Sequence, residues 1–326
     1  MPRAPERLDE FELIRRYFLR SADTAIGVAL GIGDDAALLE VPTGEQLVAA
    51  VDTLVAGRHF LPSTPARSIG HRALAVNLSD MAAMGATPRW ATLALTLPQA
   101  DPQWLQDFAA GFLALGERHG VTLVGGDTTR GPLTISVQIM GTVPAGGALR
   151  RDAARAGDLL VVSGTLGDAG AGLKFAQESP RPSDKALQFL IERFDFPTPR
   201  VQLGVAARGL ASAAMDISDG LVGDLPKILD ASHLAAVVDV ERLPVSSALR
   251  AVVAEEEARE LALGAGDDYE LLLCLPPVKL QQLVDAARRL NLTLSVIGEL
   301  RAGAGIRWTL HGADFAPRLS GFNHFD

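Results

Sequence analysis

Cysteine is almost absent from this chain of 326 residues, since Cys274 is its only example. A disulfide within the chain is therefore impossible, and a zinc site built on cysteine thiolates is disfavoured. Cys274 lies in the apolar run 269–275, Tyr-Glu-Leu-Leu-Leu-Cys-Leu, which favours a buried strand. Aromatic residues make up only 5% of the chain, so aliphatic side chains must form most of the core.

Long apolar segments and clusters of basic residues are also missing. No stretch approaches the roughly 18 uninterrupted apolar residues of a membrane span, and the first residues lack the apolar centre of a secretory leader. The chain has 39 acidic and 30 basic residues, a formal charge of −9, without a run of Lys and Arg that would attract nucleic acid. These absences predict a cytoplasmic protein whose partners include neither nucleic acid nor a membrane.

The familiar phosphate-binding loops are missing as well. Residues 164–174 resemble a Walker A loop only loosely, because Lys174 comes one residue too late and no Ser or Thr follows it. The His-Arg-Asp and Asp-Phe-Gly motifs of protein kinases do not occur. Residues 31–36, Gly-Ile-Gly-Asp-Asp-Ala, match a dinucleotide loop weakly, since two carboxylates there would repel a pyrophosphate unless metal ions intervened.

Alternating strands and helices fill most of the chain and predict an α/β (α+β) fold. The small, flexible stretch 143–148 is the best candidate boundary and divides the chain into domains 1–145 and 146–326. Helices are expected at about 11–18, 66–84, 105–120, 168–178, 184–194, 199–210, 219–231 and 278–290. Strands are expected at about 47–55, 90–97, 121–124, 133–143, 158–163, 213–217, 236–240, 269–275 and 293–300.

Aspartates recur in this chain beside Gly, Ser or Thr, close to an apolar strand or helix, and this is its most informative feature. Any one of these segments alone has the composition of a turn or a helix cap. They are Gly-Ile-Gly-Asp-Asp at 31–35, Val-Asp-Thr at 51–53, Asn-Leu-Ser-Asp at 77–80, Gly-Gly-Asp-Thr-Thr at 125–129, Met-Asp-Ile-Ser-Asp-Gly at 215–220 and Asp-Asp at 267–268.

If these carboxylates lay close together, cations between them would be needed to offset their mutual repulsion. Two like charges about 4 Å apart repel by ~4 kcal/mol at an effective dielectric constant near 20. Oxygen-rich carboxylate sites favour magnesium or calcium over zinc, and magnesium completes its coordination with water and phosphate oxygens. Glycines at 31, 33, 125 and 126 would let the backbone approach phosphate oxygens closely. If the loops converge, the sequence therefore predicts a metal–nucleotide site suited to phosphoryl transfer.

These segments also resemble a known family. Residues 31–39, 52–60, 75–86, 125–133, 215–221, 266–271 and 321–325 are similar, in the same order, to the motifs of thiamine-monophosphate kinases. The resemblance implies direct transfer of the γ-phosphoryl group of ATP to thiamine monophosphate, which yields thiamine diphosphate and ADP without a phospho-enzyme and with several Mg²⁺ ions. It also implies the two-domain fold of aminoimidazole ribonucleotide synthetase and a homodimer formed through the sheet of the N-terminal domain.

The resemblance further assigns roles to single residues, none of which is a covalent nucleophile. The N-terminal domain would hold metal and ATP, and the C-terminal domain would complete the ATP and substrate sites. The implied magnesium ligands are Asp35, Asp52, Asp80, Asp127, Asp216 and Asp219. The implied ATP contacts are Gly126, Asp127, Arg151 and Ser218, and the implied substrate contacts are His59, Asp267 and Phe322.

Two positions depart from the family pattern. Family members often have Ser-Thr before Asp52, where this chain has Ala50 and Val51, so a hydroxyl ligand is lost. They usually have Glu where this chain has Asp267, which is one methylene shorter. Two alternatives to a thiamine-monophosphate kinase remain: another enzyme of the same fold, similar to aminoimidazole ribonucleotide synthetase, and a non-catalytic binding protein for nucleotides or thiamine phosphates.

Overall fold

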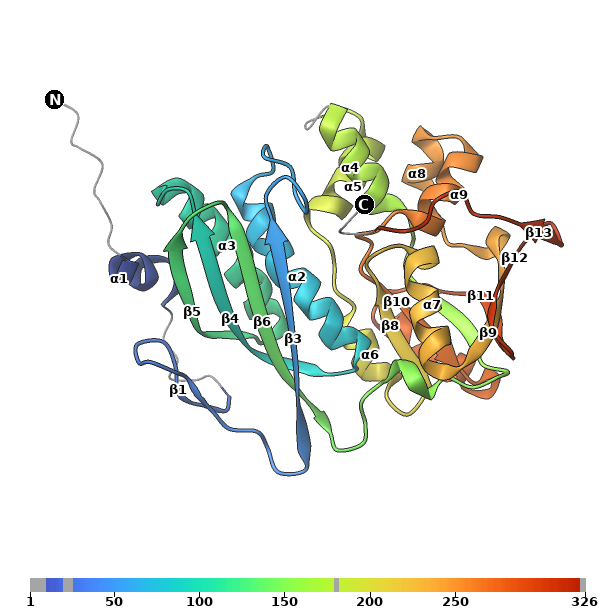
Figure 1. Cartoon of the computed structure of the whole chain (residues 1–326), viewed down its shortest axis with the longest axis horizontal. Coiled ribbons are helices and arrows are strands. Elements are labelled where there is room, and N and C mark those ends of the chain that lie inside the picture. The colour runs from blue at the N-terminus through green and yellow to red at the C-terminus, as the bar shows by residue number, and fades with distance from the viewer. Residues whose placement is uncertain (1–9, 20–25, 179–181, 323–326) are drawn as a thin grey trace. The chain divides into compact units, whose positions relative to one another are not determined.

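The computed structural model describes residues 10–19, 26–178 and 182–322, and the chain divides into two compact units. The first unit comprises Met1–Asn77 and Pro88–Thr142, and the second comprises Leu78–Thr87 and Val143–Asp326. The chain therefore enters the second unit briefly after Asn77, returns to the first, and leaves it again after Thr142. Figure 1 follows this path by colour, with the first unit mainly in blue and green.

The first unit is built on a four-stranded sheet with the strand order β3-β6-β4-β5, in which β4 and β5 are parallel. Helices α2 and α3 cover one face of this sheet (Figure 1). A separate two-stranded antiparallel sheet pairs β1 with β2. The elements are α1 (Glu10–Leu13), the π-helix η1 (Ile14–Phe18), β1 (Val28–Leu30), β2 (Leu38–Leu39), β3 (Glu45–Val55), α2 (Ala66–Ala83), β4 (Thr87–Leu97), α3 (Pro102–His119), β5 (Thr122–Arg130) and β6 (Thr134–Pro144).

Helix α3 shows how local sequence sets the limits of an element. The Asp101 side chain accepts hydrogen bonds from the backbone N–H groups of Gln103 and Trp104, and Pro102 occupies the first turn. Gly120 ends the helix with φ +66°, a conformation that glycine adopts without steric cost. The apolar spacing buries Phe108 and Phe112, whose rings stack with centroids 6.2 Å apart.

The second unit contains a seven-stranded sheet with the order β13-β12-β9-β11-β7-β10-β8. Most neighbouring strands are antiparallel, and β12 runs parallel to β9. Its strands are β7 (Leu159–Ser163), β8 (Ala213–Ile217), β9 (Leu234–Asp239), β10 (Glu270–Leu275), β11 (Leu294–Ala302), β12 (Gly305–Leu310) and β13 (Ala313–Phe315). Its helices are η2 (Arg151–Ala153), α4 (Asp168–Glu178), α5 (Lys185–Asp195), α6 (Val201–Ala207), α7 (Leu221–Ser232), η3 (Val240–Arg242), α8 (Ser247–Val252), α9 (Glu255–Gly264), η4 (Pro277–Lys279) and α10 (Leu280–Arg289).

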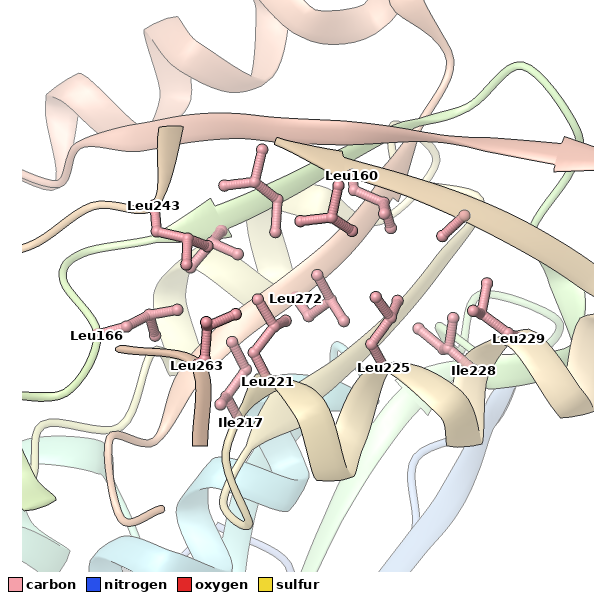
Figure 2. Close-up of a cluster of buried hydrophobic side chains, with 14 of the residues drawn as sticks. Leu160, Leu166, Ile217, Leu221, Leu225, Ile228, Leu229, Leu243, Leu263 and Leu272 are labelled. Atoms are coloured by element: carbon pink, nitrogen blue, oxygen red, sulfur yellow. The ribbon is translucent and has the colours of Figure 1, made fainter. Parts of the chain in front are cut away.

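Helix α7 packs on this sheet through one apolar stripe. Leu221, Leu225, Ile228 and Leu229 follow the spacing of a helix face and are buried. Figure 2 shows them pointing toward the strands, where they meet buried leucines of β7 and β10. Since α7 begins directly after β8, this packing fixes the loop between them, which carries Ser218 and Asp219.

The strand containing Gly125, Gly126 and Asp127 is longer than the sequence analysis predicted. A strand was expected at 121–124 with the glycines beyond it, whereas β5 continues through them to Arg130. A Cβ atom at Gly126 would lie 1.9 Å from the carbonyl oxygen of Leu93 on β4. Glycine therefore serves here to let two strands approach closely and does not end the strand.

Other predicted elements agree with the structure to within a few residues, but some elements were missed. Helix 199–210 is shorter than expected, since α6 covers only Val201–Ala207. No regular structure was expected for α8 and α9, or for β1, β2, β12 and β13. None of the described helices is both long and apolar enough to cross a membrane.

Candidate active site

In the first unit, three of the predicted site residues line one cavity. Asp35 follows Gly33, whose φ of +127° requires glycine, and the backbone N–H of Asp35 donates to Asp34 Oδ1 over 2.8 Å. Gly126 and Asp127 come from β5. Both aspartates are exposed. The cavity has a volume of about 900 Å³ and places these carboxylates beside apolar side chains that include Ile14, Phe18, Leu123 and Met140.

Asp52 and His59 do not line that cavity. Alternate residues of β3 are exposed, so Asp52 lies on the inward face, where its backbone N–H donates to Asn77 Oδ1 of α2 over 3.2 Å. Burial raises the pKa of the Asp52 carboxyl. His59 lies in the turn after β3, and its Nδ1 accepts a hydrogen bond of 3.0 Å from the backbone N–H of Val55. The proton of the neutral ring is therefore on Nε2.

In the second unit, the end of α2 meets the end of β8. Ser79 and Asp216 are both buried, and the Ser79 hydroxyl donates to Asp216 Oδ2 over 2.7 Å. Asp80 follows Ser79 in α2 and is half-buried. One hydrogen bond between residues 137 positions apart therefore connects the segments that carry two predicted magnesium ligands.

The loop after β8 is fixed by a carboxylate that the sequence analysis did not single out. Asp224 Oδ2 accepts hydrogen bonds of 2.9 Å from the backbone N–H groups of both Ser218 and Asp219. Lys227 contacts Asp219 at 2.6 Å and Asp224 at 2.8 Å. Burial lowers the pKa of Lys227 and its two hydrogen bonds raise it, with a net increase, so the ammonium stays charged at neutral pH. The sequence feature that could have identified Asp224 is its position as an acidic residue in the first turn of α7.

Two of the residues predicted to bind the substrate are held to the same loop by backbone hydrogen bonds. The N–H of Asp267 donates to the carbonyl oxygen of Ser218 over 2.8 Å, and the N–H of Phe322 donates to that of Asp219 over 3.0 Å. Ser218, Asp219, Asp267 and Phe322 therefore form one cluster, although Phe322 is more than 100 positions from Asp219. The remaining residues of the predicted C-terminal motif, 323–325, lie outside the described residues.

The backbone of Arg151 is held at a different place from this cluster. Its carbonyl oxygen accepts a hydrogen bond of 2.6 Å from Ser232, the last residue of α7, whereas Asp219 precedes the first residue of that helix. A helix of 12 residues is about 18 Å long. The main chain of Arg151 thus lies at the far end of α7, and the role of its guanidinium toward ATP stays a prediction.

The six predicted magnesium ligands fall into two groups of three, with Asp35, Asp52 and Asp127 in the first unit and Asp80, Asp216 and Asp219 in the second. Among the residues that the structure describes, no three His, Cys, Asp or Glu side chains are placed to hold a metal ion together. The donors are hard oxygen ligands, and magnesium usually needs only one or two protein carboxylates when phosphates and water supply the rest. The donor set therefore fits a magnesium ion carried by a nucleotide.

Comparison with known proteins defines the class of this chain. Residues 33–143 match the N-terminal domain of the AIR synthase related proteins, and residues 155–311 match the C-terminal domain. The predicted two-domain fold of aminoimidazole ribonucleotide synthetase is thus confirmed, as are the mixed α/β sheets.

The similar proteins include thiamine-monophosphate kinases that match along nearly their whole length. Thiamine-monophosphate kinase of Salmonella typhimurium is 44% identical over 318 residues, which covers 97% of this chain and 98% of the relative. The crystal structure of thiamine-monophosphate kinase from Stenotrophomonas maltophilia has a TM-score of 0.85 at 46% identity and covers 90% of this chain and 94% of its own. AaThiL complexed with AMPPCP and TMP has a TM-score of 0.79 at 31% identity and covers 97% of each chain. The chain belongs to the thiamine-monophosphate kinase family.

Proposed function

We propose that this chain transfers the γ-phosphoryl group of ATP to the phosphate of thiamine monophosphate. The bond between the γ-phosphorus and its bridging oxygen breaks, an oxygen of thiamine monophosphate forms the new bond to that phosphorus, and the products are thiamine diphosphate and ADP. The observation that carries this proposal is 44% identity along 97% of the chain to a thiamine-monophosphate kinase. The relative complexed with AMPPCP and TMP supports the same pair of substrates.

The roles of the residues are part of the proposal. Asp35 and Asp127 in the first unit, and Asp80, Asp216 and Asp219 in the second, would bind magnesium, with Asp52 as a further ligand. Magnesium would neutralise the phosphate oxygens and align them for in-line transfer. Gly126 would contact the phosphate oxygens of ATP through its backbone, while the space of its missing side chain is filled by the Leu93 carbonyl on β4. Ser218 and Arg151 would bind ATP, and His59, Asp267 and Phe322 would bind thiamine monophosphate.

The arrangement of the second unit supports these roles. The Ser79 hydrogen bond holds one oxygen of Asp216, and the Asp224 hydrogen bonds hold the backbone of Ser218 and Asp219. Groups restrained in this way need little reorganisation when charge develops on the transferring phosphoryl group. Asp267 and Phe322 reach the same loop, so a substrate bound by them would lie beside the proposed metal ligands of this unit.

We also propose that two copies of the chain pair through the first unit. β3 is an edge strand, and its exposed face carries Leu47, Ala49, Val51, Thr53 and Val55. Leu47 is 51% exposed and Val51 is 64% exposed. A long apolar edge strand that faces water invites association with another chain, and a second copy of the same face would bury it.

The activity is tested with purified protein, ATP, magnesium and thiamine monophosphate. Chromatography should show thiamine diphosphate and ADP forming in equal amounts, and removal of magnesium with a chelator should stop both. Tight binding of thiamine monophosphate without any product would instead favour the non-catalytic binding protein. A reaction mixture with aminoimidazole ribonucleotide synthetase substrates serves as the control for the other enzyme of this fold.

A further inference from the structure

The segment that precedes β10 has an unusual backbone. Asp267 has φ +72° and Tyr269 has φ +50°, so two residues with side chains adopt a left-handed conformation on either side of Asp268. Their backbone N–H groups donate to Ser218 and Ile217 over 2.8 and 2.9 Å. Such a conformation costs free energy and persists only where neighbouring contacts hold it.

Asp268 provides the first of these contacts. It is 1% exposed, and its carboxylate accepts hydrogen bonds from the backbone N–H groups of Gly167 at 2.7 Å and Ala169 at 3.3 Å, where α4 begins. These donors lack partners within the helix, and the helix dipole favours a negative group at this end. Burial nevertheless raises the pKa of Asp268 well above its usual value. The side chain anchors the middle of the segment in the interior of the second unit.

Glu270 anchors the other end. It is fully buried in β10, where Ser163 donates to it over 2.6 Å and Arg193 over 3.0 Å. Arg200 also forms a bidentate pair with its two carboxylate oxygens. Removing a partner from such a buried network leaves an uncompensated charge, so the network holds the start of β10 firmly.

Tyr269 connects this anchored segment to the side chain of Asp267. The tyrosine is 8% exposed, and its hydroxyl lies 3.1 Å from Asp267 Oδ1, to which it donates. A tyrosine hydroxyl bound to one of its oxygens fixes where the carboxylate of Asp267 points.

We propose that Tyr269 and Asp268 are positioning residues for Asp267, and that they set the affinity for thiamine monophosphate without touching the transferring phosphoryl group. The inference rests on the proposed function. Tyr269 acts through the carboxylate, and Asp268 acts through the backbone conformation that carries it.

The first test is Tyr269→Phe, which removes only the hydroxyl. Loss of a hydrogen bond to a carboxylate should raise KM for thiamine monophosphate about tenfold, with kcat and KM for ATP changed by less than about twofold. Tyr17→Phe, which changes the only other tyrosine of the chain, is the matched control and should leave all three constants unchanged.

A double-mutant cycle separates positioning from general damage to the fold. If Tyr269 acts through Asp267, Tyr269→Phe should add nothing to KM for thiamine monophosphate when residue 267 is already changed by Asp267→Ala. An equal increase in both backgrounds, or no increase in the otherwise unchanged chain, would overturn the inference. A wild-type chain that forms no thiamine diphosphate would instead overturn the proposed function.

Asp268→Asn tests the buried anchor separately. Asparagine has the same size but only one oxygen acceptor, so Gly167 or Ala169 loses its bond. We expect a lower melting temperature together with a higher KM for thiamine monophosphate and an unchanged KM for ATP. A loss of stability with both KM values unchanged would show that Asp268 serves folding alone.

Discussion

Single residues in the candidate site differ in how strongly the fold restrains them. Asp35 and Asp127 are exposed, whereas Asp216 is buried and bound by Ser79. Asp219 is paired with Lys227 at 2.6 Å. An exposed carboxylate can turn toward an arriving metal ion at little cost, while a buried one must already point to its place. Substitutions at the exposed positions are therefore the cleaner tests of metal binding.

Asp127→Ala should abolish turnover and leave the fold intact. A carboxylate that holds a catalytic metal contributes several kcal/mol of transition-state stabilisation, so kcat should fall by about a thousandfold or more. The steady-state rate of thiamine diphosphate formation measures the effect, and the thermal unfolding midpoint should move little because Asp127 is exposed.

Glu117→Ala is the control, since it removes an exposed carboxylate of α3 that does not line the cavity. It should change neither rate nor stability by much. Full activity of Asp127→Ala would remove this residue from the proposed metal ligands.

At the scale of secondary-structure elements, the position of α2 depends on close contact with α3. A Cβ atom at Gly70 would lie 2.0 Å from the carbonyl oxygen of Phe108, and one at Gly111 would lie 1.9 Å from that of Arg67. The two helices therefore touch backbone to backbone. Because α2 also carries Asn77, this contact helps to place the side chain that accepts the hydrogen bond from the backbone N–H of Asp52.

Gly70→Ala should destabilise the protein, although alanine is the better helix former. Alanine gains about 1 kcal/mol of helix propensity, but inserting a methyl group into a filled helix contact costs about 1–3 kcal/mol, and the facing atom here is backbone that can move only with its helix. We expect a net loss of up to about 2 kcal/mol, measured by urea unfolding.

Gly116→Ala provides the comparison within α3. A Cβ atom there would lie 3.2 Å from the nearest atom, the carbonyl oxygen of Val121, so a shift of a few tenths of an ångström suffices. Its effect should be near zero or slightly stabilising. Equal stability of the Gly70→Ala and Gly116→Ala variants would contradict the close helix contact.

The whole molecule is proposed to be a homodimer formed by the exposed face of β3. Val51→Asp places a charge in the centre of that face, where burial against a second copy would be costly. Light scattering after size-exclusion chromatography should give twice the mass of one chain for the wild type and the mass of a single chain for the variant.

Val278→Asp is the matched control because it makes the same change in the second unit, at a valine that is 87% exposed. It should leave the mass at that of the dimer. A wild-type protein with the mass of one chain at micromolar concentration would contradict the proposed pairing.

Much of the fold could be predicted from the sequence because periodicity is a local property. The strand at 269–275 and the helix at 168–178 each follow from the spacing of their own apolar residues, and both are found within one residue. Strand β5 depends on more than the spacing of its own apolar residues. Gly125 and Gly126 have the composition of a turn, and only the neighbouring strand β4 explains why glycine is needed at position 126 inside β5.

The sequence by itself determined which family the chain resembles and which carboxylates are proposed as metal ligands, because both depend on residue types in a fixed order. Only the tertiary structure decided how those residues are held. Ser79 binds Asp216, Asp268 binds the beginning of α4, and Arg200 binds Glu270, each across at least 70 positions. The order of strands in a sheet and the packing of helices on it create these contacts, and neither is encoded in the local pattern around any one of the residues.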